Sequence, residues 1–430
     1  MATKHVHIFL AAWISKIVTV IARFFTLPLI LSYLGVENYA IFAVIVSLEG
    51  WFLLSDFGMG SSIQNFLAEK RALNEPLTPT LQATTYIVLT LFSLVFPLIL
   101  MIIPILGPFL LGNLVDNYSF DTRNLLFLAG SFYFLLALTN VGYKALFAYQ
   151  KGHLVHILQG AATLISMGLT LLLRYFYEGE YKLFYILLAT ASIPALISFS
   201  VFFHLFLKRS HFALPSFEMI KMILSRSFRF WLLALLSAFA LLIDYFIMAR
   251  TLSSKDIVIY NVLSKIFAMV FVSFHAVLDA FCPTSSGLLT QLRWDEVHLL
   301  VKKSYSIGSL FVIVATTLVL IFSTTIGKLL LPDSLILSEF TILLFGLHTL
   351  IRVFADSYAM VLHSMSFFSP FFIFLPLQAL LSGICQYFLS LKFGINGILF
   401  GLMISFLFSV SWGLPREYYR QKRLFRRAEE

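Results

Sequence analysis

Residues 82–107 read QATTYIVLTLFSLVFPLILMIIPILG, a run without a charged side chain. One helix of about 20 such residues crosses the hydrocarbon core of a bilayer. The composition of the whole chain agrees: of 430 residues 60% are hydrophobic, 12% are charged, and the mean hydropathy is +0.93. A soluble domain carries about twice that charged fraction. Barrel strands would be about ten residues long and would alternate polar with apolar residues. The sequence therefore predicts a multi-span helical membrane protein.

Twelve apolar runs, each bounded by charge, glycine or proline, are expected to cross the bilayer. We expect the first run to be retained rather than cleaved, because Lys16 and Arg23 interrupt it and no A-x-A-like site closes it. The longest connections, 108–123 and 208–229, are too short for a soluble domain. The runs are 8–33, 39–66, 82–107, 124–147, 154–174, 183–207, 230–250, 257–281, 303–327, 338–362, 367–391 and 394–414.

Basic residues in the connections and near the ends of these runs favour one side of the membrane. Nineteen Lys and Arg residues fall on the side of the two termini and seven on the other. Cytoplasmic loops carry such an excess, so both termini are expected in the cytoplasm. The net charge of +9 is therefore mainly a topology signal. The basic tail 415–430 could also contact anionic lipid headgroups, at about 1 kcal/mol per basic residue; we expect no nucleic-acid partner.

The two halves of the chain resemble each other. LGVENYAIFAVI at 34–45 can be laid on LSSKDIVIYNVL at 252–263, and both stretches join a charged apolar run to the next one. Parallel repeats of this kind are related by an axis along the membrane normal. The expected fold is all-α, with twelve transmembrane helices in two six-helix bundles related by pseudo-two-fold symmetry around a central cavity. The expected domains are a first bundle at 1–209, a cytoplasmic linker at 210–229, a second bundle at 230–414 and the tail at 415–430.

Ionisable groups inside the apolar runs are the main functional signal. Each charged one costs roughly 2.5–3.5 kcal/mol at a helix centre, so the set must pair or line a hydrated cavity. Residues spaced by four or seven share a helix face. The candidates are Lys16, Arg23, Glu49, Asp56, Asp244, Lys265, His275, Asp279, Arg352 and Asp356.

Alternative roles stay open for several of these residues. Lys16 and Arg23 share one face of the first run, and Glu49 and Asp56 share one face of its neighbour, so a buried network between the two runs is expected. Asp56 precedes FGMGSS and could instead cap a helical break. The spacing also allows His275–Asp279 and Arg352–Asp356 to pair within one helix, as structural pairs or as part of a transport site. Cys282 and Cys385 are expected to be packing residues, without metal or disulfide chemistry.

Residues 34–72, LGVENYAIFAVIVSLEGWFLLSDFGMGSSIQNFLAEKRA, closely resemble the corresponding stretch of the bacterial O-antigen flippases of Wzx type, which belong to the multidrug/oligosaccharidyl-lipid/polysaccharide exporter superfamily. The residues that carry the resemblance are Gly35, Glu37, Tyr39, Phe42, Ser47, Gly50, Trp51, Asp56, Gly58, Gly60, Ser61, Gln64 and Asn65.

The resemblance implies a function. The cargo would be an undecaprenyl-pyrophosphate-linked oligosaccharide, flipped from the cytoplasmic to the periplasmic leaflet of the inner membrane by alternating access coupled to an ion gradient. It implies no cofactor and leaves polymerase and chain-length proteins as candidate partners.

Chemical roles follow from such a cargo, whose diphosphate and sugars must exchange their water for protein groups. Lys16, Arg23, Lys265 and Arg352 could neutralise the phosphates, and Gln64 and Asn65 could bind sugar hydroxyls. Glu49, Asp56, Asp244 or Asp279 could carry the coupling proton or sodium ion.

Two other functions remain to be weighed. A multidrug or cation antiporter would share the fold but would favour a net acidic cavity, whereas the basic first run favours an anionic cargo. A membrane polymerase or glycosyltransferase usually has a large outer loop with catalytic side chains, and the outer loops here are short. Neither a glycine-rich nucleotide loop nor a Ser/His/Asp set stands out, so we expect neither ATP-driven export nor an enzyme.

Overall fold

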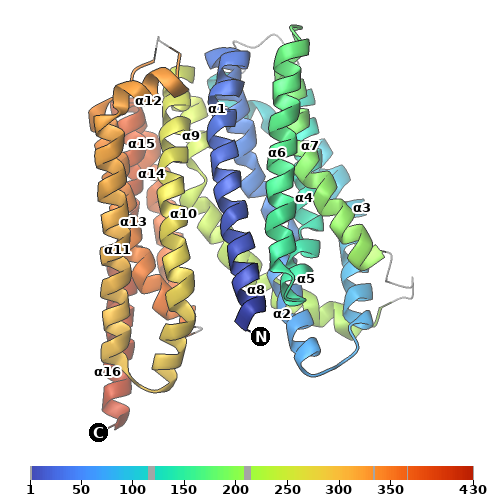
Figure 1. The fold of residues 1–430 in the computed structure, drawn as a ribbon, viewed down its shortest axis with the longest axis vertical. Helices are drawn as coiled ribbons and strands as arrows, with labels where there is room; N and C mark the ends of the chain where they lie inside the picture. Colours follow the sequence, from blue (N-terminus) through green and yellow to red (C-terminus); the bar gives the residue numbers. More distant parts are fainter. Residues whose placement is uncertain (1, 115–121, 208–214, 333–334, 366, 430) are drawn as a thin grey trace. The chain divides into compact units, whose positions relative to one another are not determined.

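The computed structural model describes residues 2–114, 122–207, 215–332, 335–365 and 367–429. Side chains are described from Val18 onward, except those of residues 20, 23, 72, 104, 283, 290 and 425–429. The described residues form helices and turns without a strand (Figure 1). The chain divides into two compact units, unit 1 at Met1–Leu235 and unit 2 at Leu236–Glu430.

Unit 1 is built from long helices joined by short turns. Its helices are α1 (Ala2–Phe52), η1 (Leu53–Asp56), α2 (Met59–Ala72), α3 (Thr78–Leu111), η2 (Gly112–Leu114), α4 (Thr122–Thr139), α5 (Val141–Ala148), α6 (Gly152–Phe176), α7 (Lys182–Phe202), the π-helical turn η3 (Phe203–Leu207) and most of α8 (Phe217–Leu241). The core packs α2, α3, α4, α5 and η3 together around fully buried side chains such as Phe134, Ile63 and Phe206.

The stretch quoted for its resemblance is broken twice in the structure. Gly35 has φ 77° and ψ 172° inside α1, a left-handed conformation that separates two helical segments. Phe57 and Gly58 are also left-handed, at φ 49° and 74°, and they separate η1 from α2. The apolar run at 39–66 is therefore not one straight span, because two consecutive positive φ values end the helix before α2 begins.

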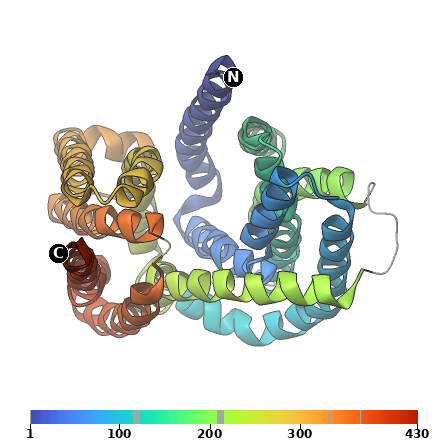
Figure 2. The same cartoon turned by 90° about the horizontal axis from the view of Figure 1, so that it is seen from below.

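Unit 2 follows the same construction. Its helices are the end of α8, α9 (Asp244–Thr251), α10 (Ser254–Thr290), α11 (Trp294–Ile321), α12 (Ser323–Leu330), α13 (Glu339–Ser364), α14 (Ser369–Phe393), α15 (Ile395–Leu407) and α16 (Val410–Glu429). In Figure 2, α10, α11 and α13 are seen nearly end on, side by side, in yellow to orange. α10 starts with a capping box in which the Ser253 hydroxyl accepts the Asp256 N–H and the Asp256 carboxylate accepts the Ser253 N–H.

Close backbone packing joins α14 to α15. A Cβ on Gly401 would stand 2.5 Å from the backbone nitrogen of Gln386, and a Cβ on Gly397 would collide with the backbone of Leu389. Glycines four residues apart give two membrane helices this close approach. Van der Waals packing between backbones therefore holds this pair together where lipid supplies no hydrophobic driving force.

Eleven helical segments of the described residues are long and apolar enough to cross a bilayer. The third to twelfth predicted runs each overlap one of these eleven segments. The first two runs both overlap the segment Phe24–Asp56, and the side chains of residues 1–17 are outside those described. Only 17% of the most apolar stretch of the α3 segment is buried, and Leu94, Met101 and Ile105 of α3 are exposed. Such a face fits contact with lipid tails.

Several helices extend beyond the apolar runs that predicted them. α11 begins at Trp294, nine residues before the run at 303–327, and its polar first turns contact α16. Trp294 and Tyr418 are buried with ring centroids 6.0 Å apart, and Lys422 reaches Asp295 at 2.8 Å.

Candidate functional site

Asp56 lies at the break between η1 and α2 in unit 1. Its Oδ1 accepts the Gly58 N–H at 2.7 Å and its Oδ2 accepts the Gly60 N–H at 3.1 Å. The Lys144 side chain runs past Gly60, close enough to act electrostatically on the carboxylate. Both oxygens therefore satisfy backbone donors at the start of α2, where an anion also interacts favourably with the helix dipole. This is the capping geometry that the sequence left open for Asp56.

α8 closes over the same break. The Trp231 Nε1–H donates to the Leu54 carbonyl at 3.0 Å, and the rings of Trp231 and Phe57 lie 5.6 Å apart. Gly58 packs directly on the α8 backbone, since a Cβ there would stand 2.6 Å from the Trp231 nitrogen and would collide with the Ser227 carbonyl. Glycine at this position is required both by its positive φ and by this contact.

The other predicted residues of unit 1 lie on α1 and α2. Glu49 is half-buried and acts electrostatically on Tyr133 of α4, a buried residue whose ring lies 6.1 Å from that of Phe52. Gln64 and Asn65 are half-buried on α2, on adjacent positions about 100° apart around the helix. The side chains of the last two, Lys16 and Arg23, lie outside the described residues, so their pairing with Glu49 stays a prediction.

In unit 2, Arg352 lies within a compact charged cluster, which we call the Arg352 cluster: Phe271 and His275 of α10 with Arg352 and Asp356 of α13. The Arg352 guanidinium carbon lies 3.7 Å from the centre of the Phe271 ring. Its Nε is 3.8 Å from Asp356 Oδ2, and His275 Nε2 is 3.7 Å from that same oxygen. One carboxylate oxygen is thus shared by two nitrogen groups, neither within hydrogen-bond distance.

Asp244 forms a second buried site next to the Arg352 cluster. It is 8% exposed, its Oδ2 accepts the Tyr260 hydroxyl at 2.6 Å, and its Oδ1 accepts the Tyr245 N–H at 2.9 Å. Arg352 acts electrostatically on Tyr260, which connects this site to the cluster. The Tyr260 and Phe345 rings, 5.2 Å apart, pack between α10 and α13. The structure therefore brings two of the predicted residues, Asp244 and Arg352, into one neighbourhood.

The sequence predicted some of these contacts and missed others. The Arg352–Asp356 pair is confirmed, whereas His275 contacts Asp356 instead of Asp279. Asp279 is exposed, with no Lys, Arg or His nitrogen of the described side chains within 4 Å, and Lys265 is half-buried on α10. Phe271 under Arg352 was not singled out; its spacing of four residues from His275 on one helix face is the signal that could have found it.

No group of three or more His, Cys, Asp or Glu side chains among the described residues could hold a metal ion. Cys282 and Cys385 are free cysteines.

Comparison with solved structures defines the class of protein. The chain superposes on a lipid II flippase, MurJ, in an inward closed conformation with a TM-score of 0.71 at 14% identity, covering 95% of this chain and 86% of that one. It also superposes on an inward-facing multidrug resistance transporter of the MATE family and MOP superfamily, again with a TM-score of 0.71 at 14% identity, covering 94% and 96%. The chain therefore has the same fold as these two multi-pass membrane proteins.

Comparison with curated sequences identifies the family. The chain is 32% identical to a protein of Yersinia pseudotuberculosis named for O-antigen export, over 96% of this chain and 95% of that one, and 30% identical to an O-antigen transporter of Salmonella typhimurium, over 95% of each. The chain belongs to this family of O-antigen transporters. No protein-family model matches it. These relatives are transporters, which agrees with the expectation that the protein is not an enzyme and excludes the polymerase and glycosyltransferase alternatives.

Proposed function

We propose that the protein is a flippase that moves undecaprenyl-pyrophosphate-linked O-antigen repeat units from the cytoplasmic to the periplasmic leaflet of the inner membrane. Membership of the O-antigen transporter family over nearly the full chain carries this proposal. The fold shared with a lipid II flippase supports it, because a membrane-embedded helical scaffold of this kind accommodates a lipid-linked sugar. Both termini lie in the cytoplasm in this proposal, as the bias of basic residues predicts.

The same proposal includes the number and arrangement of the membrane spans. Twelve spans form two six-helix bundles at 1–209 and 230–414 with pseudo-two-fold symmetry around a central cavity, and transport proceeds by alternating access. The linker at 210–229 includes the start of α8, and the tail at 415–430 lies in α16. Polymerase and chain-length proteins are the proposed protein partners.

Arg352 is the proposed ligand of the cargo diphosphate for which the geometry offers most support. Its guanidinium is oriented by the Phe271 ring and is held only loosely by Asp356, at 3.8 Å. A diphosphate can accept two parallel N–H bonds from a guanidinium, which Lys cannot supply. The diphosphate would therefore displace Asp356, whose shared oxygen can then approach His275. Further contacts are proposed for Lys16, Arg23, Lys265, Gln64 and Asn65.

Ion coupling is proposed at the buried acids. Asp244, with its hydrogen bonds from Tyr260 and Tyr245, is shielded from solvent. A shielded carboxylate binds a proton more readily than an exposed one, which suits proton exchange. Glu49, Asp56 and Asp279 are the other proposed carriers, although Asp56 already satisfies two backbone donors.

A multidrug or cation antiporter remains the second candidate function, because the fold matches a multidrug transporter with the same TM-score as the lipid II flippase. Purified protein in proteoliposomes distinguishes the two. Lipid-linked oligosaccharide should become accessible to an external glycosidase faster when a proton or sodium gradient is imposed, whereas a cationic dye should not be transported. Dye transport without oligosaccharide flipping would refute the proposal.

Variants of the Arg352 cluster make the test specific. Arg352→Lys keeps the charge but loses the planar fork and the stacking on Phe271, and we expect at least a tenfold slower flipping rate. Arg420→Lys is the matched control, since Arg420 is exposed on α16 and should tolerate the change. Equal flipping rates for the two variants would remove Arg352 from the proposed site.

A further inference from the structure

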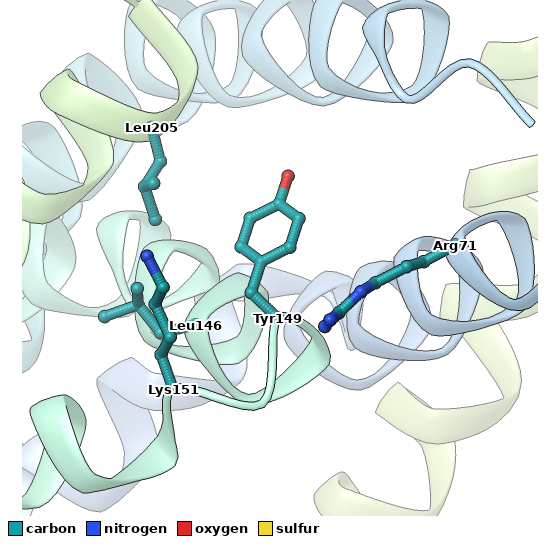
Figure 3. Close-up of a pocket in the computed structure, with 5 residues that line it drawn as sticks. All are labelled: Arg71, Leu146, Tyr149, Lys151 and Leu205. Atoms are coloured by element: carbon teal, nitrogen blue, oxygen red, sulfur yellow. The ribbon is translucent and has the colours of Figure 1, made fainter. Parts of the chain in front are cut away.

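A second polar site lies in unit 1, at the turn between α5 and α6. It is a pocket of about 290 Å³ lined by Arg71, Leu146, Tyr149, Lys151 and Leu205. Figure 3 shows Arg71 and Lys151 on opposite sides of the Tyr149 ring, with the two leucines next to Lys151. The pocket thus combines two cations, one phenol and an apolar wall.

The turn between α5 and α6 builds this pocket. Gln150 adopts a left-handed conformation at φ 57°, and the Lys151 N–H donates back to the Leu146 carbonyl at 2.8 Å. The chain therefore reverses within three residues and places Lys151 against the end of α5. Arg71 of α2 donates from Nη1 to the Ala148 carbonyl at 3.2 Å, which fixes its guanidinium on the same turn. The remaining guanidinium N–H groups are available to a ligand.

The charge of the pocket is not balanced by the protein. The two acids near the end of α2, Glu69 and Glu75, already pair with other cations, Arg226 at 2.7 Å and Lys70 at 3.5 Å. Among the described side chains, no carboxylate lies within 4 Å of either cation of the pocket. Two uncompensated cations that flank one pocket favour an anion, and guanidinium and ammonium groups both bind phosphate well.

The position of the pocket indicates whether it binds a lipid phosphate or a free phosphate. Three membrane-spanning segments end or begin beside it, at Thr122–Ala148, Gly152–Phe176 and Lys182–Leu207. Its side chains are therefore at the depth of lipid headgroups rather than in the hydrocarbon. The leucine wall provides a surface for the first carbons of a lipid chain, which a free phosphate would not use.

We propose that this pocket binds the phosphate of an anionic membrane phospholipid, with Arg71 and Lys151 on the phosphate oxygens and Leu146 and Leu205 against the attached chain. A lipid held there would fix the α5–α6 turn to α2 through Arg71.

Native mass spectrometry of the full-length protein in detergent tests this proposal. The protein is titrated with phosphatidylglycerol, with phosphatidylcholine and with inorganic phosphate. We expect phosphatidylglycerol to bind tightest, and the double variant Arg71→Ala/Lys151→Ala to weaken it about tenfold or more, which is 1.4 kcal/mol per factor of ten. Lys302→Ala/Lys303→Ala is the matched control, because it removes two exposed cations of unit 2 from α11 and should leave this binding unchanged.

Each other outcome overturns the proposal. Equal weakening by the two double variants would show diffuse electrostatic attraction rather than a pocket. Equal affinity for the two phospholipids would show that the cations do not distinguish an anionic headgroup from a zwitterionic one. Inorganic phosphate that competes at the same concentration as phosphatidylglycerol would show a site for free phosphate without a lipid.

Arg71→Lys with Lys151 intact is the control for misfolding of the double variant. It keeps both positive charges and should retain most of the phosphatidylglycerol binding. The assay contains no lipid-linked sugar, so its failure leaves the proposed flippase function standing.

Discussion

Replacing Gly58 by alanine should destabilise unit 1 strongly, for two separable reasons. The residue has φ 74°, and an L-residue in this conformation costs roughly 1–2 kcal/mol. The new Cβ would also lie 2.6 Å from the Trp231 nitrogen, against a helix backbone that can move only as a whole. Such overpacking costs about 1–3 kcal/mol more. Alanine restricts the unfolded chain and returns about 0.4–1 kcal/mol. We expect a net loss of roughly 2–4 kcal/mol for Gly58→Ala.

Two other glycines separate these contributions. Gly401 lies within α15 without a positive φ, but an added Cβ would stand 2.5 Å from the backbone nitrogen of Gln386, so Gly401→Ala should show the cost of a backbone contact alone. Gly168 lies within α6, without a positive φ and in open space. Gly168→Ala should therefore be slightly stabilising, by about 0.5–1 kcal/mol, as expected for alanine in a helix.

Heat inactivation of the detergent-solubilised protein provides the assay. Samples are heated, and the fraction that remains monodisperse is measured by size-exclusion chromatography with fluorescence detection. Because unfolding of such a protein is often irreversible, the half-lives are ranked at one temperature rather than converted to equilibrium values. The expected order is Gly168→Ala, wild type, Gly401→Ala and then Gly58→Ala. If Gly58→Ala matched Gly401→Ala, the positive φ of Gly58 would contribute nothing and this reasoning would be refuted.

Three further predictions concern polar contacts. Asp56→Ala should destabilise the protein by about 1–3 kcal/mol, since two backbone donors lose their acceptor. Asp56→Asn should destabilise it less, because one side-chain oxygen remains, and the heat inactivation half-lives of the two variants should follow that order. Tyr260→Phe should cost about 1–3 kcal/mol by removing the hydroxyl that donates to buried Asp244, and a half-life equal to that of wild type would contradict this. The hydrogen bonds from Arg226 lower the pKa of Glu69 on α2 below its usual value near 4.3. The ion pair therefore stabilises the folded protein above about pH 4.3, and this stabilisation is lost as the pH falls through the lowered pKa of Glu69. The half-lives of wild type and Glu69→Gln should therefore differ at neutral pH and converge in strongly acidic buffer; a difference that grew on acidification would show the opposite sign.

Local patterns in the sequence predicted much of the fold. The apolar runs predicted the helical segments, because a chain in lipid must satisfy every backbone group within its own helix and must keep charge out of the hydrocarbon. The Arg352–Asp356 pair was also predictable, since residues four apart on one helix lie side by side regardless of tertiary structure. The start of α11 was not predicted in this way, because its first turns from Trp294 are polar and precede the apolar run. The contact of these turns with α16 depends on tertiary structure.

What the sequence by itself determined is therefore the medium, the helical segments and the contacts within one helix. Only the tertiary structure decided that His275 meets Asp356 rather than Asp279, and that Arg71 and Lys151 flank one pocket. The physical reason is that helical periodicity is local, whereas the choice of a neighbouring helix depends on packing. In a membrane protein a lipid-facing apolar surface and a packed one have the same composition, so the sequence does not reveal which face meets which neighbour.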